Sequence, residues 1–272
     1  MTDYHGYATF QEFLDNVQYS RIGILSYEKI FGHTYVSTGG EDTTNDLCSA
    51  LSLGPDSSVL DIGCGIGGSA FYLARKYGCR VEAIDLSKNM LDIGMERLKE
   101  QVEKAGLRED QVRLVLADCT TVDYPEASFD LVYSRDTILH IADKATLYQR
   151  CLRWLKPGGQ LLVTDYCCGE KPWPDDYAAY VKQRGYHLLT VPEYGAVLSS
   201  VGFTDVEAID FTDRFRRALV DEQSRVVGLR EQFLKDVGEQ MYQYILDGWG
   251  AKIGRVDRGC QRWGLFKARK PL

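Results

Sequence analysis

The stretch Val59–Gly68, VLDIGCGIGG, constrains this chain more than any other part of its sequence. An apolar run leads directly into a glycine-rich turn and then into a helical pattern, which is the order of strand, turn and helix in α/β proteins. Glycine lacks a Cβ atom, so Gly63 and Gly65 allow the backbone to bend sharply and to approach a ligand closely. We therefore expect a sheet whose first turn binds a small molecule.

Apolar runs and amphipathic stretches alternate from Ser58 onward. This alternation predicts a Rossmann-like α/β fold, in which a seven-stranded, mostly parallel sheet carries helices on both faces. The predicted strands are Val59–Ile62, Val81–Ile84, Val112–Leu116, Phe129–Tyr133, Gln160–Thr164, Val206–Phe211 and Trp263–Ala268. The predicted helices between them are Gly68–Tyr77, Lys88–Ala105 and Thr146–Leu155, the last ended by a tight turn at Lys156–Gly159.

Two helical additions accompany this predicted core. Phe10–Phe31 carries apolar and aromatic residues at helical spacing, and Asp213–Lys252 is too long for a plain loop between the last two strands. Within the second addition, Asp213–Arg230 is typical of an amphipathic helix. We expect both additions to form a lid at the carboxyl edge of the sheet, where α/β proteins bind ligands.

The length of 272 residues is compatible with one elaborated α/β domain. We expect a single domain over residues 1–272. It comprises an N-terminal helical lid at 1–45, a cofactor-binding core at 46–168 and an acceptor-binding half at 169–272, whose inserted helices span about 213–252.

The charge balance bears on possible partners. The chain has 32 Lys and Arg and 39 Asp and Glu, so its net charge is −7, and this negative charge disfavours binding to nucleic acid. Met1–Phe10 lacks the pattern of a secretory leader, and no apolar run approaches the ~18 residues of a membrane span. The eight Cys and four His show no zinc-ligand spacing. We expect a cytoplasmic monomer that binds a small molecule and has no metal, nucleic-acid or membrane partner.

Acidic residues stand at the ends of three successive predicted strands. The glycine turn fits either a nicotinamide dinucleotide or S-adenosylmethionine, but Asp61 lies two residues before Gly63, where a carboxylate would repel a pyrophosphate and could hold a cationic amino-acid group. Asp85 stands where an acid can bind both ribose hydroxyls, and Asp118 stands near the expected adenine. The ordinary alternative for each acid is a helix N-cap or a solvated strand end.

These acids, with the WLKPGG turn at Trp154–Gly159, resemble the seven-stranded S-adenosylmethionine-dependent methyltransferases. Over about Phe13–Lys270 the chain also resembles the phosphoethanolamine N-methyltransferase family. The stretches that carry this resemblance are Val17–Gly23, Tyr27–Gly40, Tyr133–Ile141, Thr164–Cys167, Tyr180–Tyr186, Asp247–Lys252 and Gln261–Phe266. The resemblance implies that S-adenosylmethionine is the cofactor and that phosphoethanolamine and its methylated forms are substrates, converted towards phosphocholine.

The same resemblance implies roles for individual residues. Tyr19 and His140 would form a catalytic pair, with Asp136 as an orienting carboxylate. Residues implied at the cofactor are Val36, Ser37, Gly63, Asp85 and Asp118, to which the turn itself adds Asp61 and Gly65. Residues implied at the phosphobase are Gln18, Tyr27, Tyr166, Arg184, Tyr186 and Lys252.

The chemistry suits these residue types. A primary amine with a pKa near ~10 is mostly protonated at neutral pH, so a base such as His140 must take its proton before the nitrogen can attack a methyl group. Asp136 lies four residues before His140, on the same face if the segment is helical, and Tyr19 could relay the proton. Arg184 and Lys252 could bind phosphate. The ordinary alternatives are a satisfied helical histidine and solvated surface charges.

Three other functions remain open at this point. A methyltransferase for another small amine, such as a glycine derivative, would need a carboxylate clamp and no Lys252. Gly63, Gly65 and Gly68 also allow an NAD-dependent oxidoreductase, against which Asp61 counts. A non-catalytic S-adenosylmethionine-binding module is possible on the motifs alone.

Overall fold

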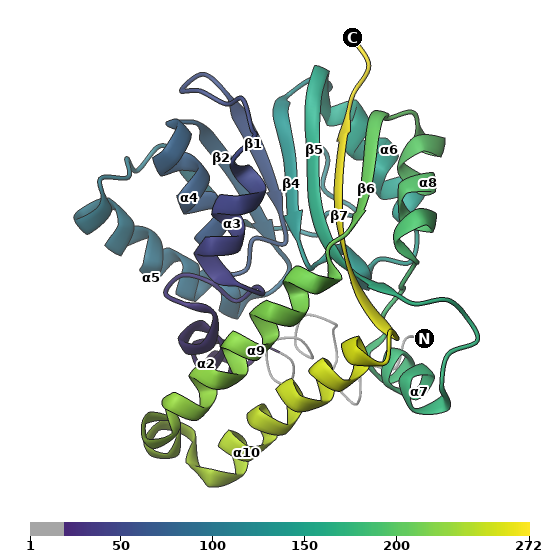
Figure 1. Ribbon diagram of the computed structural model, residues 1–272. Coiled ribbons are helices and arrows are strands. Elements are labelled where there is room, and N and C mark those ends of the chain that lie inside the picture. The colour runs from purple at the N-terminus through teal and green to yellow at the C-terminus, as the bar shows by residue number, and fades with distance from the viewer. Residues whose placement is uncertain (1–18) are drawn as a thin grey trace. The chain divides into compact units, whose positions relative to one another are not determined.

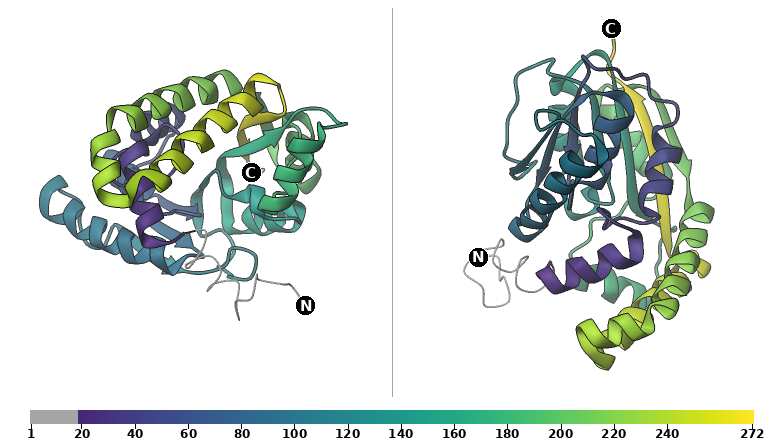
Figure 2. Two further views of the ribbon diagram at one scale, coloured as in Figure 1. Left: turned by 90° about the horizontal axis from the view of Figure 1, so that it is seen from below. Right: turned by 90° about the vertical axis from the view of Figure 1, so that its left-hand side faces the viewer.

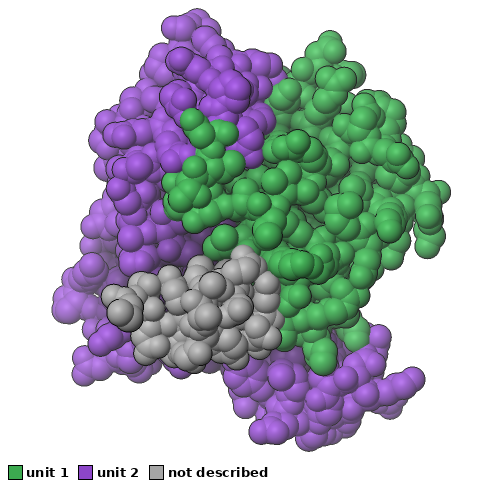
Figure 3. All heavy atoms as spheres, turned by 180° about the vertical axis from the view of Figure 1, so that it is seen from behind, with its two compact units in different colours: residues 1–123 green, residues 124–272 purple. Residues whose placement is uncertain are grey.

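Strand β1, Ser58–Ile62, begins the sheet where the glycine-rich motif predicts it, in a computed structural model that describes residues 19–272. The chain divides into two compact units, Met1–Asp123 and Tyr124–Leu272 (Figure 3). The boundaries expected at 45 and 168 stay a prediction. Gln18, and the part of Phe10–Phe31 that precedes residue 19, lie outside the described residues.

The sheet of the first unit is parallel. β1 pairs with β2 (Arg80–Asp85), and β2 pairs with β3 (Val112–Leu116). The helices α4 (Gly68–Tyr77) and α5 (Lys88–Ala105) have the bounds that the sequence predicts (Figure 1). Local signals define α5, because the Ser87 hydroxyl accepts from the first turn and Gly106 ends the helix in the left-handed region.

Two further helices belong to the first unit. α2 covers Arg21–Phe31 and begins where the Ser20 hydroxyl accepts a hydrogen bond from the Gly23 N–H. α3 covers Gly40–Cys48. The described part of the predicted N-terminal helix is therefore helical from Arg21 onward.

The second unit holds the remaining strands. β4 (Phe129–Arg135) pairs in parallel with β5 (Leu155–Cys168), and β7 (Gln261–Arg269) pairs antiparallel with both β5 and β6 (Thr204–Asp210). The complete order is β3-β2-β1-β4-β5-β7-β6, which confirms the predicted seven-stranded, mostly parallel sheet.

Strand β5 is longer than the predicted Gln160–Thr164, and the predicted tight turn lies within it as an irregularity. Phe129 pairs with Leu155, whereas Leu131 pairs with Gln160, so the intervening residues bulge from the ladder. Lys270 holds this bulge, because its carbonyl oxygen accepts from Gly158 N–H at 3.0 Å and its N–H donates to the Gly159 carbonyl oxygen at 2.9 Å. Because Lys270 is distant in sequence from Gly158 and Gly159, no local sequence pattern predicts that β5 continues through this bulge.

The helices of the second unit include a long late pair. The shorter ones are η2, a 3₁₀ turn at Ile138–His140, α6 at Lys144–Trp154, α7 at Asp175–Arg184 and α8 at Val191–Val201. α9 (Thr212–Gly228) and α10 (Arg230–Asp257) pack against each other (Figure 2). They confirm the predicted helical insertion, but α10 runs beyond its predicted end at Lys252. No helix of the described chain is long and apolar enough to cross a membrane.

Candidate functional site

The glycine-rich turn is tied to the end of β2. The backbone N–H groups of Gly63 and Cys64 donate to the Ile84 carbonyl oxygen at 2.8 and 3.0 Å, and the Gly65 N–H donates to Asp85 Oδ2 at 2.8 Å. Gly63 and Gly65 have φ angles of 72° and 56°, in the left-handed region that favours glycine. The motif thus forms the sharp turn that the sequence predicts.

Asp85 is the centre of this arrangement. Its second oxygen, Oδ1, accepts from the Ser87 N–H at 2.8 Å, immediately before α5. The half-buried carboxylate is therefore held by backbone groups on two sides. Its predicted contact with a ribose stays a prediction.

The other two acids differ in their surroundings. Asp61 in β1 is only 1% exposed. Burial is the main reason that the pKa of the Cys64 thiol is raised, and the negative charges of Asp85 and Asp61 raise it further, so both acids act on the turn. Asp118 is half-buried after β3 and accepts from the N–H and hydroxyl of Thr120 at 2.8 and 2.7 Å. That is an ordinary turn interaction, so its predicted role beside adenine stays untested.

The loop after α2 packs directly on the turn. A Cβ atom on Gly65 would lie 2.7 Å from Val36 Cγ2, so only glycine leaves room for the loop there. Glu28 anchors the loop, because its Oε1 accepts from the Thr34 N–H at 2.9 Å while its carboxylate binds Arg97. Val36 therefore lies against the turn, as a cofactor-lining residue would.

The predicted residues nearest the N-terminus also belong to this unit. Tyr19 packs against the apolar cluster that contains Ile66 of the turn, and its carbonyl oxygen accepts from Asn89 Nδ2 at 3.0 Å. Tyr27 is half-buried on α2, with its ring centroid 6.2 Å from that of Phe31. Ser37 is half-buried in the loop that carries Val36.

His140 lies at the end of the 3₁₀ turn η2. Its ring centroid is 5.3 Å from that of Tyr186, at an interplanar angle of 73°. The residue as a whole is exposed, but desolvation of the imidazole by the protein atoms around it, followed by the cations Lys144 and Arg184, lowers the pKa of His140 to about 4. The imidazole is consequently neutral at physiological pH and able to accept a proton.

The predicted helical relation between Asp136 and His140 is wrong. Asp136 has a φ angle of 52° and precedes a single 3₁₀ turn, so the two residues do not share an α-helical face. Its Oδ1 instead accepts from Trp263 Nε1 at 2.6 Å and from the Thr164 hydroxyl at 3.2 Å. Its Oδ2 is buried without a hydrogen-bond partner among the described residues, and burial raises the pKa of Asp136.

Three cations surround one tyrosine. The guanidinium carbons of Arg255 and Arg184 lie 3.8 and 5.9 Å from the centroid of the Tyr180 ring. Lys252 Nζ donates to the Tyr166 hydroxyl at 3.3 Å. Burial by itself would raise the pKa of Tyr180, but these three positive charges, together with a hydrogen bond to Tyr186, outweigh it and lower that pKa. Within residues 19–272, none of the three cations forms a salt bridge with a carboxylate.

Sequence reasoning missed Tyr180 and Arg255. Tyr180 begins the stretch Tyr180–Tyr186, of which only Arg184 and Tyr186 are predicted as site residues, and Arg255 follows Lys252 by three residues on the same helix. The helical spacing of those two cations was the available signal, since residues three apart share a helix face.

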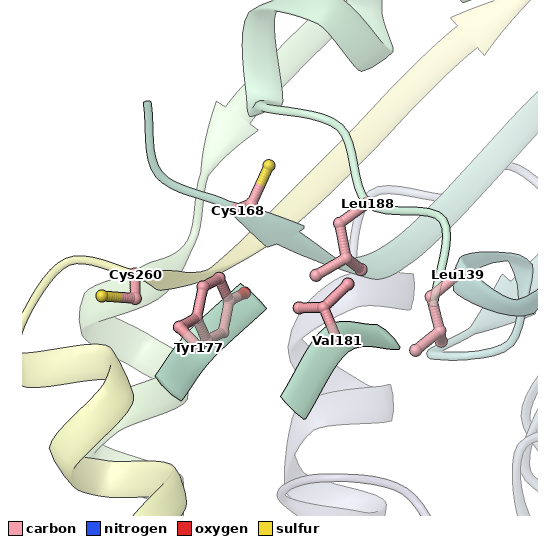
Figure 4. Packing of buried hydrophobic residues seen from close by; sticks show 6 residues of the cluster. All are labelled: Leu139, Cys168, Tyr177, Val181, Leu188 and Cys260. Carbon is pink, nitrogen blue, oxygen red and sulfur yellow. The ribbon is translucent and has the colours of Figure 1, made fainter. Parts of the chain in front are cut away.

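An apolar cluster supports the aromatic residues of this site. Its buried members are Leu139, Cys168, Tyr177, Val181, Leu188 and Cys260 (Figure 4). Tyr166, Tyr180 and Tyr186 pack against it. The cluster joins η2, β5 and α7, so the three tyrosines are supported by one packed core within the second unit.

Comparison with known proteins places the chain among methyltransferases. A family model described as a methyltransferase domain matches residues 60–163. The phosphoethanolamine N-methyltransferase of Plasmodium falciparum is 41% identical to this chain, and the alignment covers 95% of each protein. A phosphoethanolamine N-methyltransferase of Triticum aestivum is 48% identical over 96% of this chain and 50% of that protein.

A solved structure gives the same result at the level of the fold. Phosphoethanolamine N-methyltransferase 2 of Haemonchus contortus, in complex with phosphomonomethylethanolamine and S-adenosylhomocysteine, is 34% identical and has a TM-score of 0.91. The match covers 98% of this chain and 61% of that one. Among the curated relatives, this chain spans about half the length of the plant proteins that it matches.

Proposed function

This chain belongs to the phosphoethanolamine N-methyltransferase family, and we propose that it transfers methyl groups from S-adenosylmethionine to the nitrogen of phosphoethanolamine and of its mono- and dimethyl forms, towards phosphocholine. The observation that carries the proposal is the cluster of Arg184, Lys252 and Arg255, which forms no salt bridge within the described chain. Lys252 and Arg255 are half-buried and Arg184 is exposed, and a group of cations without carboxylate partners favours an anionic ligand.

A phosphate monoester suits these cations. The two guanidinium groups can each donate two hydrogen bonds to phosphate oxygens, and the ammonium of Lys252 adds a point charge. Tyr166 lies beside Lys252 and could donate a further hydrogen bond through its hydroxyl. A glycine derivative would offer one carboxylate to three cations, so this cluster favours phosphate over the alternative amine substrate.

The nitrogen end of the substrate would lie beside Asp136 and the aromatic rings. Asp136 Oδ2 is buried without a hydrogen-bond partner among the described residues, so it could accept from an ammonium N–H group. The faces of Tyr166 and Tyr186 could stabilise the nitrogen after methyl groups have replaced its hydrogen atoms, because a quaternary cation cannot donate hydrogen bonds.

His140 could remove the proton that blocks attack. Its low pKa makes it a weak base in the ligand-free protein, but the positive charge of Arg184 is one cause of that low value. A phosphate dianion bound at Arg184 would offset this charge and raise the pKa of His140. Substrate binding would thus strengthen the base that acts on the substrate.

The first unit offers residues that fit S-adenosylmethionine. We propose that the buried Asp61, the fixed carboxylate of Asp85 and the half-buried Asp118 hold the cofactor beside the glycine turn, together with Val36 and Ser37 of the adjoining loop. When bound, S-adenosylmethionine supplies an electrophilic methyl group on a sulfonium. We propose that Tyr19 completes this site from beside the turn.

Methyl-transfer assays with labelled S-adenosylmethionine test the proposal. Purified protein should methylate phosphoethanolamine and turn over ethanolamine poorly, because ethanolamine leaves the three cations without a phosphate. Comparable rates on ethanolamine or on sarcosine would exclude the proposed substrate. Calorimetry should detect binding of S-adenosylhomocysteine to the protein. Binding of a nicotinamide dinucleotide instead would favour the oxidoreductase alternative.

We also propose that the protein is a cytoplasmic monomer without nucleic-acid or membrane partners. All eight cysteines are free thiols, as is usual in a reducing compartment, and the net charge of −7 would repel nucleic acid. Light scattering coupled to size-exclusion chromatography should give the mass of one chain, 30.7 kDa, and twice that mass would refute the monomer.

A further inference from the structure

A buried charged network lies beneath the turn that carries His140. Lys144, the first residue of α6, is 5% exposed, and Asp165 in β5 is fully buried. Lys144 Nζ donates to the carbonyl oxygens of Ile138 and Ile141 at 2.6 and 2.9 Å. Backbone groups on both sides of the histidine are therefore bound by one buried ammonium.

Asp165 binds the same turn from β5. Its Oδ1 accepts from the Leu139 N–H at 3.1 Å, and its Oδ2 accepts from the Tyr194 hydroxyl at 3.2 Å. The hydroxyls of Tyr194 and Tyr148 lie 2.6 Å apart, and both tyrosines are fully buried. Both oxygens of the carboxylate thus have partners, so the network is satisfied and rigid.

Stability alone is a poor explanation for these charges. Lys144 and Asp165 form no direct salt bridge with each other, and desolvation of buried charges is costly, so apolar side chains of similar size could serve a core equally well. Burial raises the pKa of Asp165 and lowers that of Lys144, whereas the opposite charge of each partner acts against that shift. Three of the four hydrogen bonds that the two side chains make go to the backbone of one turn.

We propose that Lys144 and Asp165 are positioning residues, which hold the His140 imidazole where it can take the proton of the acceptor ammonium. In that step the N–H bond breaks, its electron pair stays on the nitrogen, and the proton passes to the imidazole. This inference rests on the proposed function, and it assigns to the two buried charges the fixed geometry that general-base catalysis requires.

Kinetics of Lys144→Met test the inference first. We expect kcat on phosphoethanolamine to fall about 10- to 100-fold, as a small misplacement of a catalytic group does, with little change in KM. Lys144→Arg keeps a charge with several donors and should recover part of the rate. Lys235→Met, at an exposed lysine of α10, is the matched control and should retain wild-type kcat. Rates are referred to the fraction of protein that binds S-adenosylhomocysteine in calorimetry, so loss of folded protein cannot imitate the effect.

A double-mutant cycle separates positioning from general damage. If Lys144 acts through His140, adding Lys144→Met to His140→Ala should reduce kcat no further than His140→Ala alone, because the losses of residues in one unit are not additive. Losses that multiply would overturn the inference. Asp165→Asn, which keeps the shape of the side chain but removes its charge, takes the place of Lys144→Met in the cycle if the latter does not fold.

A measurement without substrate distinguishes failure of this inference from failure of the proposed function. The charged and titratable side chains that act on His140 are Lys144 of α6, Arg184 of α7 and His187 after α7. In ¹³C-histidine NMR, Lys144→Met should raise the pKa of His140 and move its ring signals, because one cation and the support of the turn are lost. Unchanged His140 signals and pKa would refute the positioning role whichever substrate the enzyme uses. Absence of methyl transfer by the wild type, with shifted signals in the variant, would refute the proposed function alone.

Discussion

The guanidinium carbon of Arg255 lies 3.8 Å from the centroid of the Tyr180 ring. This contact joins α10 to α7 within the second unit, and it brings Arg255 to the tyrosine that Arg184 also approaches. Arg255 Nε donates to Gln261 Oε1 at 3.0 Å, which fixes the plane of the guanidinium. A cation with fixed orientation and no carboxylate partner in the described chain is suited to bind phosphate.

Arg255→Ala should therefore weaken binding of the phosphobase. Loss of a charge-assisted hydrogen bond of about 1.5–3 kcal/mol corresponds to a rise of about 10- to 100-fold in the KM for phosphoethanolamine. Arg258→Ala is the matched control, because that exposed arginine binds Asp176 instead. Affinity for S-adenosylhomocysteine, measured by calorimetry, should stay unchanged in both variants. An equal KM in the two variants would show that Arg255 does not bind the phosphobase.

His140→Ala should depress kcat by about 100- to 10,000-fold, the usual effect of losing a general base. Because the pKa of His140 is lowered to about 4, the imidazole is neutral and able to accept a proton at every pH well above that value. The wild-type kcat/KM, which reports the pKa values of the free enzyme, should consequently depend weakly on the protonation of His140 near neutrality. The rate of the variant should rise with pH, as more of the amine loses its proton without help.

The control for this variant is His187→Ala, since His187 is a second, exposed histidine of the same unit and has the smallest effect among the groups that act on the pKa of His140. It should retain the wild-type rate. A pH–rate profile of His140→Ala that matched the wild type in height and shape would assign proton removal to another group.

Asp85→Asn should weaken binding of S-adenosylmethionine and S-adenosylhomocysteine by about 1–3 kcal/mol. The amide has one oxygen acceptor and one NH2 donor where the carboxylate has two acceptors. The Gly65 N–H, the Ser87 N–H or a ligand hydroxyl therefore loses its partner. Asp92→Asn, at an exposed carboxylate of α5, is the control and should bind both ligands normally. Calorimetry that gives the same dissociation constant for both variants would contradict the role of Asp85.

Gly65→Ala should cost more stability than Gly106→Ala. Both glycines have positive φ, 56° and 72°, so both substitutions meet the penalty of about 1–2 kcal/mol for a left-handed non-glycine residue. A Cβ at Gly65 would also lie 2.7 Å from Val36 Cγ2, whereas one at Gly106 meets no atom within 4 Å. Denaturant unfolding should show the difference, and adding Val36→Ala should recover part of it. Equal losses would show that the loop does not press on the turn.

Local signals in the sequence were sufficient for the cofactor half. The strand β1, the glycine turn and the bounds of α4 and α5 follow from an apolar run, from glycines that adopt positive φ and from a serine cap, all of which act within a few residues. Asp85 could be predicted for the same reason, because a residue that ends a parallel strand beside such a turn must face it. The family resemblance supplied the acceptor residues, which no local pattern identifies.

Only the tertiary structure decided the surroundings of the acceptor residues. Asp136 was expected to face His140 by helical spacing, but its backbone is left-handed and its carboxylate binds Trp263 from the far end of the chain. Lys144 and Asp165 similarly acquire their roles by folding, because β5 and α6 bring two charges from separate segments under one turn. Periodicity and turn chemistry act between neighbours in sequence, whereas hydrogen bonds and burial act between neighbours in space, and the environment of a catalytic group depends on the latter.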